Sequence, residues 1–175
     1  MDARRSTVAA KIIEGRMTAA WDREVTVFLI GMRLNSFVRI RQWWPVFTAM
    51  PRMLREQSRD EDSGMLGYRL LWGGPRLAYL VQYWSSPEAL HAYASASDKA
   101  HSPAWAAFNR RVREGGRAVG TWHETYVVPA GAHEAVYTNM PAFGLAAATE
   151  VVPVGRRGER AADRLAKRPG VSRSA

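Results

Sequence analysis

Residues 77–84 constrain the fold most, because they alternate like a strand and yet are apolar at both sets of alternating positions. One set comprises Leu77, Tyr79, Val81 and Tyr83, and the other comprises Ala78, Leu80 and Trp84. Successive side chains of a strand point to opposite faces of its sheet. Both faces of the sheet that contains this strand must therefore be covered by other apolar layers.

The surrounding segments predict the layer on one face. Runs of apolar and β-branched residues bounded by turn residues predict strands at 25–30, 65–72, 76–84 and 119–128. Apolar residues at helical spacing predict helices over 37–57 and 104–114, and the two prolines of the first predict either a kinked helix or two short ones. A third helix is predicted after Ser85, which caps it, with Glu88 in a capping box. Gly73-Gly74-Pro75 predicts a tight turn between the two middle strands. The resulting order predicts an α+β, ferredoxin-like β-α-β-β-α-β fold with a four-stranded antiparallel sheet.

The second face of the sheet calls for another layer. Two ferredoxin-like sheets that pack face to face close a barrel, which predicts a homodimer with a dimeric α+β barrel. A monomer whose own C-terminal arm covers the sheet is the alternative. The expected organisation is an N-terminal extension (1–20), the α+β-barrel domain (21–129), a C-terminal packing arm (130–150) and a basic disordered tail (151–175).

The charge distribution argues against a nucleic-acid partner. The formal net charge is +9, but residues 151–175 hold seven basic and two acidic side chains, and residues 1–20 hold four and two. The body between them is nearly balanced, whereas a nucleic-acid module usually carries its basic patch on the folded face that docks. The basic C-terminal residues are therefore interpreted as a solvated, disordered end.

Several other classes of site and location are also disfavoured. The absence of cysteine excludes disulfides, thiolate metal sites and a thiol nucleophile. The longest apolar run, residues 25–32, is too short to cross a bilayer, and no phosphate-binding loop, Rossmann fingerprint or closely spaced metal ligands are found. We expect a cytoplasmic protein without a membrane partner or a metal site.

The chain also resembles a known group of enzymes. Residues 81–94 (VQYWSSPEALHAYA) resemble the junction between the third strand and its helix in the antibiotic-biosynthesis-monooxygenase superfamily. Five further segments resemble an uncharacterised family grouped with a fungal monooxygenase of terpenoid biosynthesis: 50–56 (MPRMLRE), 64–68 (GMLGY), 101–105 (HSPAW), 107–112 (AFNRRV) and 120–126 (GTWHETY). The resemblance covers residues 22–148.

This resemblance implies a small-molecule monooxygenase of secondary metabolism that acts on an apolar or aromatic substrate in the barrel cavity. In the implied chemistry, which often needs no cofactor, a deprotonated substrate itself passes an electron to dioxygen, and the protein supplies a base, an oxyanion donor and a dry pocket. Two alternatives remain open. Some relatives of this superfold bind haem through a histidine, so His101 or His123 could be an axial ligand, or the chain could be a non-catalytic ligand-binding module.

His123, Glu124 and His101 are the candidate catalytic residues. His123 has the imidazole expected of a base at neutral pH. Strand parity places it on one face with Thr121, and places Glu124 on the other, so the face that lines the cavity decides between them. His101 precedes a predicted helix, with Trp105 and Asn109 at helical spacing behind it.

Eight residues are candidates for substrate binding, and each has a structural alternative. Arg69 lies within an apolar strand and needs either an acidic ligand group or a carboxylate such as Glu124. Aromatic residues could wall a pocket but are more often part of a core. The full set is Arg69, Trp72, Tyr83, Trp105, Asn109, Trp122, Tyr126 and Asn139, the last as part of a lid.

Overall fold

The computed structural model describes residues 11–44, 48, 63–95, 110, 113–114 and 116–165. The chain divides into two compact units. Val25–Val127 forms the sheet unit, and Met1–Glu24 together with Val128–Ala175 forms the terminal unit. The sheet unit falls close to the 21–129 domain expected from the sequence.

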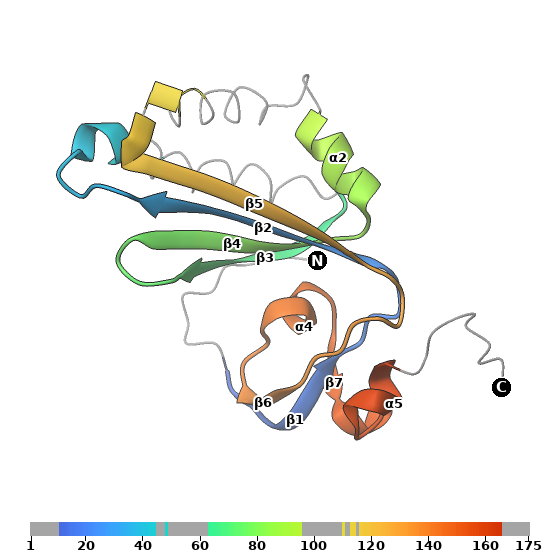
Figure 1. Cartoon of the computed structure of the whole chain (residues 1–175). Coiled ribbons are helices and arrows are strands. Elements are labelled where there is room, and N and C mark those ends of the chain that lie inside the picture. Colours follow the sequence, from blue (N-terminus) through green and yellow to red (C-terminus); the bar gives the residue numbers. More distant parts are fainter. Residues whose placement is uncertain are drawn as a thin grey trace. The chain divides into compact units, whose positions relative to one another are not determined.

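The sheet unit is built on a four-stranded sheet in the order β3-β4-β2-β5 (Figure 1). Its strands are β2 (Val25–Leu34), β3 (Met65–Trp72), β4 (Leu77–Trp84) and β5 (Val119–Val128). The first and third strands of the predicted order are central, which is the ferredoxin-like arrangement. The predicted α+β fold is therefore confirmed, and the strand expected at 25–30 extends to Leu34.

The register of the strands separates the sheet into two distinct faces. On β4, Ala78, Leu80, Gln82 and Trp84 are buried, while the alternating residues Leu77, Tyr79, Val81 and Tyr83 are half-buried. Paired residues of neighbouring strands point to the same face, and the ladder pairs Phe28 with Gln82 and Ile30 with Leu80. We call this buried side the helix face, because α2 (Pro87–Ser95) packs on it through Tyr93, whose ring centroid lies 5.3 Å from that of Trp84. The other side is called the opposite face.

The hydrophobic core lies on the helix face. Met32, Ala78, Leu80 and Val119 are buried together, and Trp43 packs against them. Gln82 is also buried there, and its side-chain carbonyl accepts a hydrogen bond of 3.0 Å from the indole N–H of Trp84. A buried polar group that has its partner avoids the free-energy cost of an unmade hydrogen bond.

The hairpin between β3 and β4 forms at the predicted turn. Gly73 N–H donates to the Leu77 carbonyl at 2.9 Å, and Gly74 has a φ of +95°. Only glycine adopts such a φ without steric cost. The two strands then pair antiparallel from Gly67 opposite Tyr83 to Trp72 opposite Ala78.

The start of α2 corrects the predicted cap. The hydroxyl of Ser86, not that of Ser85, accepts a hydrogen bond from Ala89 N–H at 3.1 Å, and the Ser86 carbonyl accepts one from Leu90 N–H. Ser86 is therefore the N-cap, and Pro87 takes the first helical position. Glu88 falls one position too early for a capping box, and backbone hydrogen bonding at the helix start lowers its pKa.

The terminal unit contains a second sheet, with strand order β6-β1-β7. β1 (Ile13–Ala19) pairs antiparallel with both β6 (Tyr137–Met140) and β7 (Val151–Pro153). The unit also contains α4 (Gly144–Ala148), η3 (Val154–Arg156) and α5 (Ala161–Leu165). The N-terminal extension and the C-terminal arm of the sequence prediction therefore supply strands of one sheet.

The prediction that the chain is disordered from residue 151 is wrong for residues 151–165. Val152 and Val154 are buried, and the basic side chains find acidic partners far along the chain. Arg164 pairs with Glu134, Arg157 with Asp22, and Arg16 with Glu159. Charge counted within a window of sequence cannot reveal such distant pairs. Residues 166–175 lie outside the described residues.

Two predicted helices fall largely outside the described residues. Within 37–57, residues 40–44 and 48 are helical, and within 104–114, residues 110, 113 and 114 are helical. A short helix, η2 (Gly116–Ala118), then leads into β5. None of the helices in the described ranges has both the length and the apolar character needed to cross a membrane.

Candidate functional site

His123 lies on the helix face of β5. Its ring centroid is 5.8 Å from that of Phe28, a β2 residue that the ladder places on the helix face beside Gln82. Val119, two alternations earlier on β5, belongs to the buried core of the same face. The imidazole itself is exposed. His123 therefore combines an accessible proton acceptor with an adjacent aromatic surface.

Glu124 and Tyr126 lie on the opposite face and interact with each other. The Tyr126 hydroxyl donates a hydrogen bond of 2.7 Å to the Glu124 carboxylate. This hydrogen bond, together with the negative charge of Glu124, raises the pKa of Tyr126. Both side chains are exposed. The pair therefore holds a proton between two oxygens on the side of the strand that His123 does not face.

Trp122 precedes this pair and identifies the face on which it lies. Its ring centroid is 6.0 Å from that of Tyr79, one of the half-buried residues of β4. Its indole also covers the backbone of Gly31, the residue that the ladder pairs with Tyr79. Trp122, Glu124 and Tyr126 thus share the opposite face, as strand parity predicted, and the structure separates them from His123.

Arg69 and Tyr83 also belong to the opposite face. The ladder pairs Arg69 with Val81, and Tyr83 alternates with Val81 along β4. However, β3 and β5 form the two edges of the sheet. At about 4.8 Å per strand spacing, their backbones lie roughly 14 Å apart. The alternative in which Arg69 pairs with Glu124 is therefore not supported, and Tyr126 takes the position of partner to Glu124.

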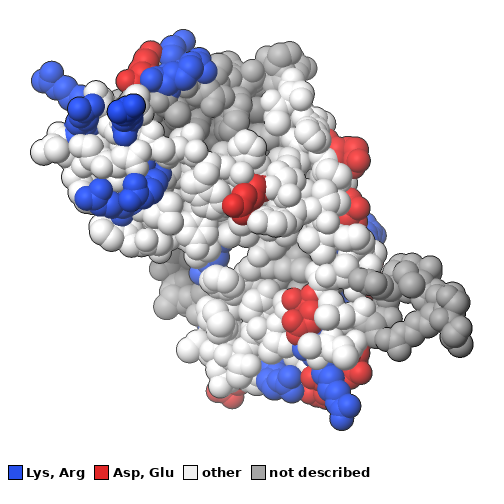
Figure 2. All heavy atoms as spheres, viewed as in Figure 1, with Lys and Arg blue, Asp and Glu red and all other residues white. Residues whose placement is uncertain are grey.

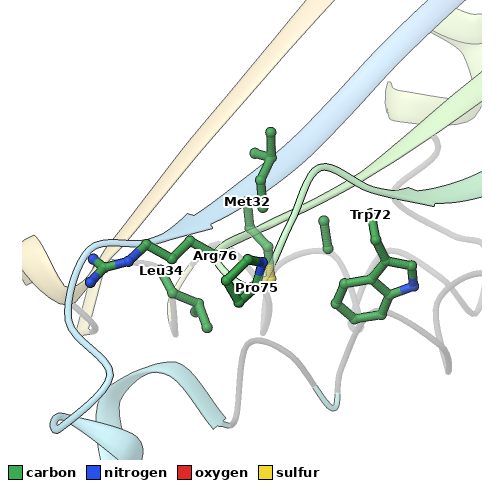
Figure 3. Close-up of a pocket in the computed structure, with 7 residues that line it drawn as sticks. Met32, Leu34, Trp72, Pro75 and Arg76 are labelled. Carbon is green, nitrogen blue, oxygen red and sulfur yellow. The ribbon is translucent and has the colours of Figure 1, made fainter.

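Trp72 ends β3 beside a small cavity (Figure 3). The cavity has a volume of about 10 Å³ and is lined by Met32, Leu34, Trp72, Pro75, Arg76, Leu77 and Ala78. A space of this size holds about one water molecule. It cannot hold an organic substrate, so this cavity does not identify a substrate site.

Asn139 has a structural role in the terminal unit. Its side-chain carbonyl accepts a hydrogen bond of 2.8 Å from Gly15 N–H, where the pairing of β1 with β6 shifts register. Gly15 and Asn139 have φ values of +87° and +51°. Asparagine tolerates this left-handed conformation better than most residues. A place for Asn139 in a lid stays a prediction.

The remaining candidates cannot be placed. His101, Trp105 and Asn109 lie outside the described residues. Among the residues that are described, no group of three or more His, Cys, Asp and Glu side chains could hold a metal ion. Sequence reasoning missed Phe28, because an aromatic residue inside an apolar strand gives no sign that a histidine of another strand will contact it.

Comparison with known proteins identifies the family to which the sequence is similar. The sequence profile described as monooxygenase af470-like matches residues 25–145. The search of curated proteins found no significant match.

Among the similar solved structures, one with a TM-score of 0.58 shows the fold. Aldoxime dehydratase OxdRE, in complex with butyraldoxime, is 15% identical with a TM-score of 0.58, and the match covers 82% of this chain and 44% of that one. The cofactor-independent oxygenase SnoaB from Streptomyces nogalater is 13% identical with a TM-score of 0.41, covering 59% of this chain and 91% of that one. A dimeric ferredoxin-like protein from an uncultured marine organism is 12% identical with a TM-score of 0.38, covering 62% and 91%.

The profile match spans the whole sheet unit, from the first residue of β2 through β5 to α4 of the terminal unit. It also covers both faces of the sheet on which the candidate residues lie. The chain belongs to the monooxygenase af470-like family.

Proposed function

We propose that the chain is a monooxygenase that oxidises an apolar, electron-rich small molecule on the helix face of its sheet, with His123 as the base. The family supports the reaction class. The observation that carries the assignment of the site is the contact of the exposed His123 ring with Phe28, at 5.8 Å between centroids. An aromatic substrate could pack against Phe28 while it presents an acidic C–H or O–H group to the imidazole.

The chemistry of the two faces favours His123 over Glu124. An imidazole has an ordinary pKa of about 6.5, close to the value that suits a general base at neutral pH. An exposed carboxylate is a much weaker base, with an ordinary pKa of about 4.3. Glu124 is in addition occupied by the hydrogen bond from Tyr126, whose raised pKa makes it a poorer acid. Proton removal from the substrate is therefore assigned to the helix face.

The proposed reaction uses dioxygen as its co-reactant. His123 takes a proton from a CH₂ group of the substrate that is acidified by a neighbouring carbonyl or phenol. The resulting carbanion reduces dioxygen, and a C–O bond forms as a peroxide. The O–O bond then breaks as the second hydrogen leaves, so that the CH₂ group becomes C=O and one oxygen atom leaves as water. The substrate supplies all the electrons, so this stoichiometry needs no external reductant.

We also propose that a second copy of the chain covers the opposite face. Leu77, Tyr79, Val81 and Tyr83 are apolar or aromatic there and only half-buried. Covering such a face removes apolar surface from water. Light scattering should then give twice the 19.6 kDa mass of one chain. A mass equal to one chain would favour the alternative, in which the chain covers its own sheet.

The test compares neighbouring residues that point to opposite faces of one strand. Oxygen uptake is measured with a panel of naphthols and cyclic 1,3-diketones for the wild type, His123→Gln, Glu124→Gln and Tyr126→Phe. Loss of a general base typically lowers the rate about 10²- to 10⁴-fold. We expect a loss of this size for His123→Gln only. A comparable loss confined to Glu124→Gln and Tyr126→Phe would move the site to the opposite face.

The visible spectrum of the purified protein tests the cofactor-independent part of the proposal. A haem group bound through an imidazole would give a Soret band. A colourless protein that consumes oxygen supports the substrate-driven reaction. A Soret band that disappears in His123→Gln would assign this histidine to haem ligation instead.

A further inference from the structure

Asn35 gathers arginines from three separate segments at one end of the sheet unit. The guanidinium of Arg33 donates to the Asn35 side-chain carbonyl at 2.6 Å, and that of Arg76 donates to the Asn35 backbone carbonyl at 3.3 Å. The Asn35 amide group donates to the Arg117 carbonyl at 3.1 Å, and its backbone N–H donates to the Ala118 carbonyl at 2.9 Å. The end of β2, the β3–β4 hairpin and η2 are thereby joined at a single residue.

Residues 37–44, which continue from this junction, expose apolar side chains. Val38 is 90% exposed, Ile40 55% and Trp44 53%. Phe37 ties the segment to the junction, because the Arg76 guanidinium lies 4.5 Å from the centre of its ring and its carbonyl accepts a hydrogen bond from the Trp43 indole. Large apolar residues exposed together indicate an interaction site.

Basic residues surround these apolar side chains. Arg39 and Arg41 alternate with Val38 and Ile40, and both are exposed. We call this surface the arginine tip and define it by Arg33, Phe37, Val38, Arg39, Ile40, Arg41, Trp44, Arg76 and Arg117. Figure 2 shows basic side chains gathered at this end of the sheet unit.

Few acidic side chains are found in the described part of the sheet unit. Among the described residues of the sheet unit, the acidic side chains are Glu88, Glu114 and Glu124. Glu88 is in the first turn of α2 and Glu124 is midway along β5. Glu114, two residues before η2, is thus the described acid nearest to the tip in sequence. The tip thus contains five arginines, and one described carboxylate lies near them in sequence, although the body of the chain is nearly balanced overall.

We propose that the arginine tip docks the protein onto the surface of an anionic lipid membrane. Arginine guanidinium groups bind the headgroup phosphates of acidic lipids, and each basic residue near such a surface adds to the affinity. Exposed aliphatic and Trp side chains insert at the boundary between headgroups and acyl chains. The tip places both kinds of group on the same short segment. This docking is peripheral and needs no membrane-spanning helix.

A lipid surface fits the tip better than a nucleic acid does. Phosphates of either partner would satisfy the arginines, but Val38 and Ile40 offer no hydrogen bonds to a sugar–phosphate backbone. Exposed at 90% and 55%, these two side chains gain only from a partner with an apolar layer beneath its charges. The bilayer interface has this composition.

Vesicle flotation of the full chain tests the proposal. The probes are vesicles of phosphatidylcholine alone and of phosphatidylcholine with about one third phosphatidylserine, as a model of an anionic leaflet. We expect binding to the anionic vesicles only. The double variant Arg39→Glu with Arg41→Glu should weaken binding at least about twentyfold, since each arginine near the surface contributes about fivefold.

The matched control reverses the same number of charges elsewhere. Arg156 and Arg160 are exposed residues of the terminal unit, so Arg156→Glu with Arg160→Glu changes the net charge equally without touching the tip. Equal loss in both double variants would reduce the effect to net charge and overturn the proposal. Circular dichroism of each variant verifies that the fold is retained.

A second variant tests the apolar contribution. Val38→Ser with Ile40→Ser keeps every charge and should still weaken binding to the anionic vesicles severalfold, including at high salt, where electrostatic attraction is screened. Unchanged vesicle binding by this variant would overturn the proposal that the apolar side chains of the tip insert into the bilayer. Binding of the wild type to a DNA duplex but not to the anionic vesicles would overturn the lipid assignment.

Discussion

Trp122 of β5 covers the backbone of Gly31 on the neighbouring strand β2. A methyl group added at Gly31 would lie 2.6 Å from the Trp122 indole nitrogen and 2.8 Å from Cβ of Tyr79. Glycine is thus required at this position by space and not by backbone conformation. The contact fixes Trp122 on the opposite face, and strand alternation then directs His123 to the helix face.

Substitution of Gly31 should displace Trp122. Gly31→Ala is expected to lower the free energy of unfolding by about 1–3 kcal/mol, the usual cost of overpacking, and to change the near-ultraviolet circular dichroism of the indole. Gly120→Ala is the control, because its methyl group would lie 3.5 Å from the Asn35 amide nitrogen, an ordinary contact distance. Equal destabilisation by both variants would contradict the contact.

Substitution of Ser86, but not of Ser85, should remove the α2 cap and lower the stability of the protein. Ser86→Ala deletes the acceptor of the Ala89 N–H and should cost about 1 kcal/mol of stability. Chemical denaturation of Ser86→Ala and Ser85→Ala compares the two serines directly. A larger effect at Ser85 would restore the cap predicted from the sequence.

Glu134, the partner of Arg164, should stabilise the terminal unit. The Arg164 side chain is 4% exposed and bonds Glu134 as well as the carbonyls of Gly158 and Glu159. Glu134→Ala leaves a buried guanidinium without its carboxylate, and we expect a loss of about 3 kcal/mol.

Glu159→Ala serves as the control for this pair. Glu159 bonds Arg16 at 2.9 Å, but these side chains are 68% and 50% exposed, so the loss should stay below about 1 kcal/mol. Hydrogen exchange of residues 151–165 is the second readout. Rapid exchange throughout this segment in the wild type would show that it is disordered after all.

Two tyrosines should ionise later than an ordinary phenol. Burial raises the pKa of Tyr137, and the hydrogen bond to Glu124 raises that of Tyr126. Phenolate absorbance is followed through an alkaline titration of the wild type, Tyr137→Phe and Tyr126→Phe. Compared with the wild type, each variant should show a smaller increase in phenolate absorbance at the high-pH end of the titration. A difference that appears instead near the ordinary pKa of 10.0 would contradict the environment described.

The same shifts determine the sign of the pH dependence of stability. A folded-state pKa above the unfolded value means that the folded protein retains a proton that the unfolded chain releases. The stabilising contribution is therefore complete below the unfolded pKa and is lost as the pH rises through the folded pKa. Melting temperatures of Tyr137→Phe should fall less steeply than those of the wild type above about pH 10.

The four strands of the sheet unit and their order were predictable from the sequence, because the alternation that defines a strand is a local property; the three strands of the terminal unit were not predicted. The β3–β4 hairpin follows from two apolar runs joined by Gly73-Gly74-Pro75. The separation of His123 from Glu124 follows from the two-residue period of a strand. Each of these conclusions needs only neighbours in the chain.

Pairings between distant residues were decided by the tertiary structure alone. The contact between the two rings showed that His123 shares the helix face with Phe28, and the strand order placed Arg69 at the edge of the sheet remote from Glu124. The sequence predicted Arg164 to be part of a solvated tail, whereas in the folded chain it pairs with Glu134. Charge and apolar content can be counted along a chain, but which groups meet depends on contacts that close long loops, and no local pattern encodes them.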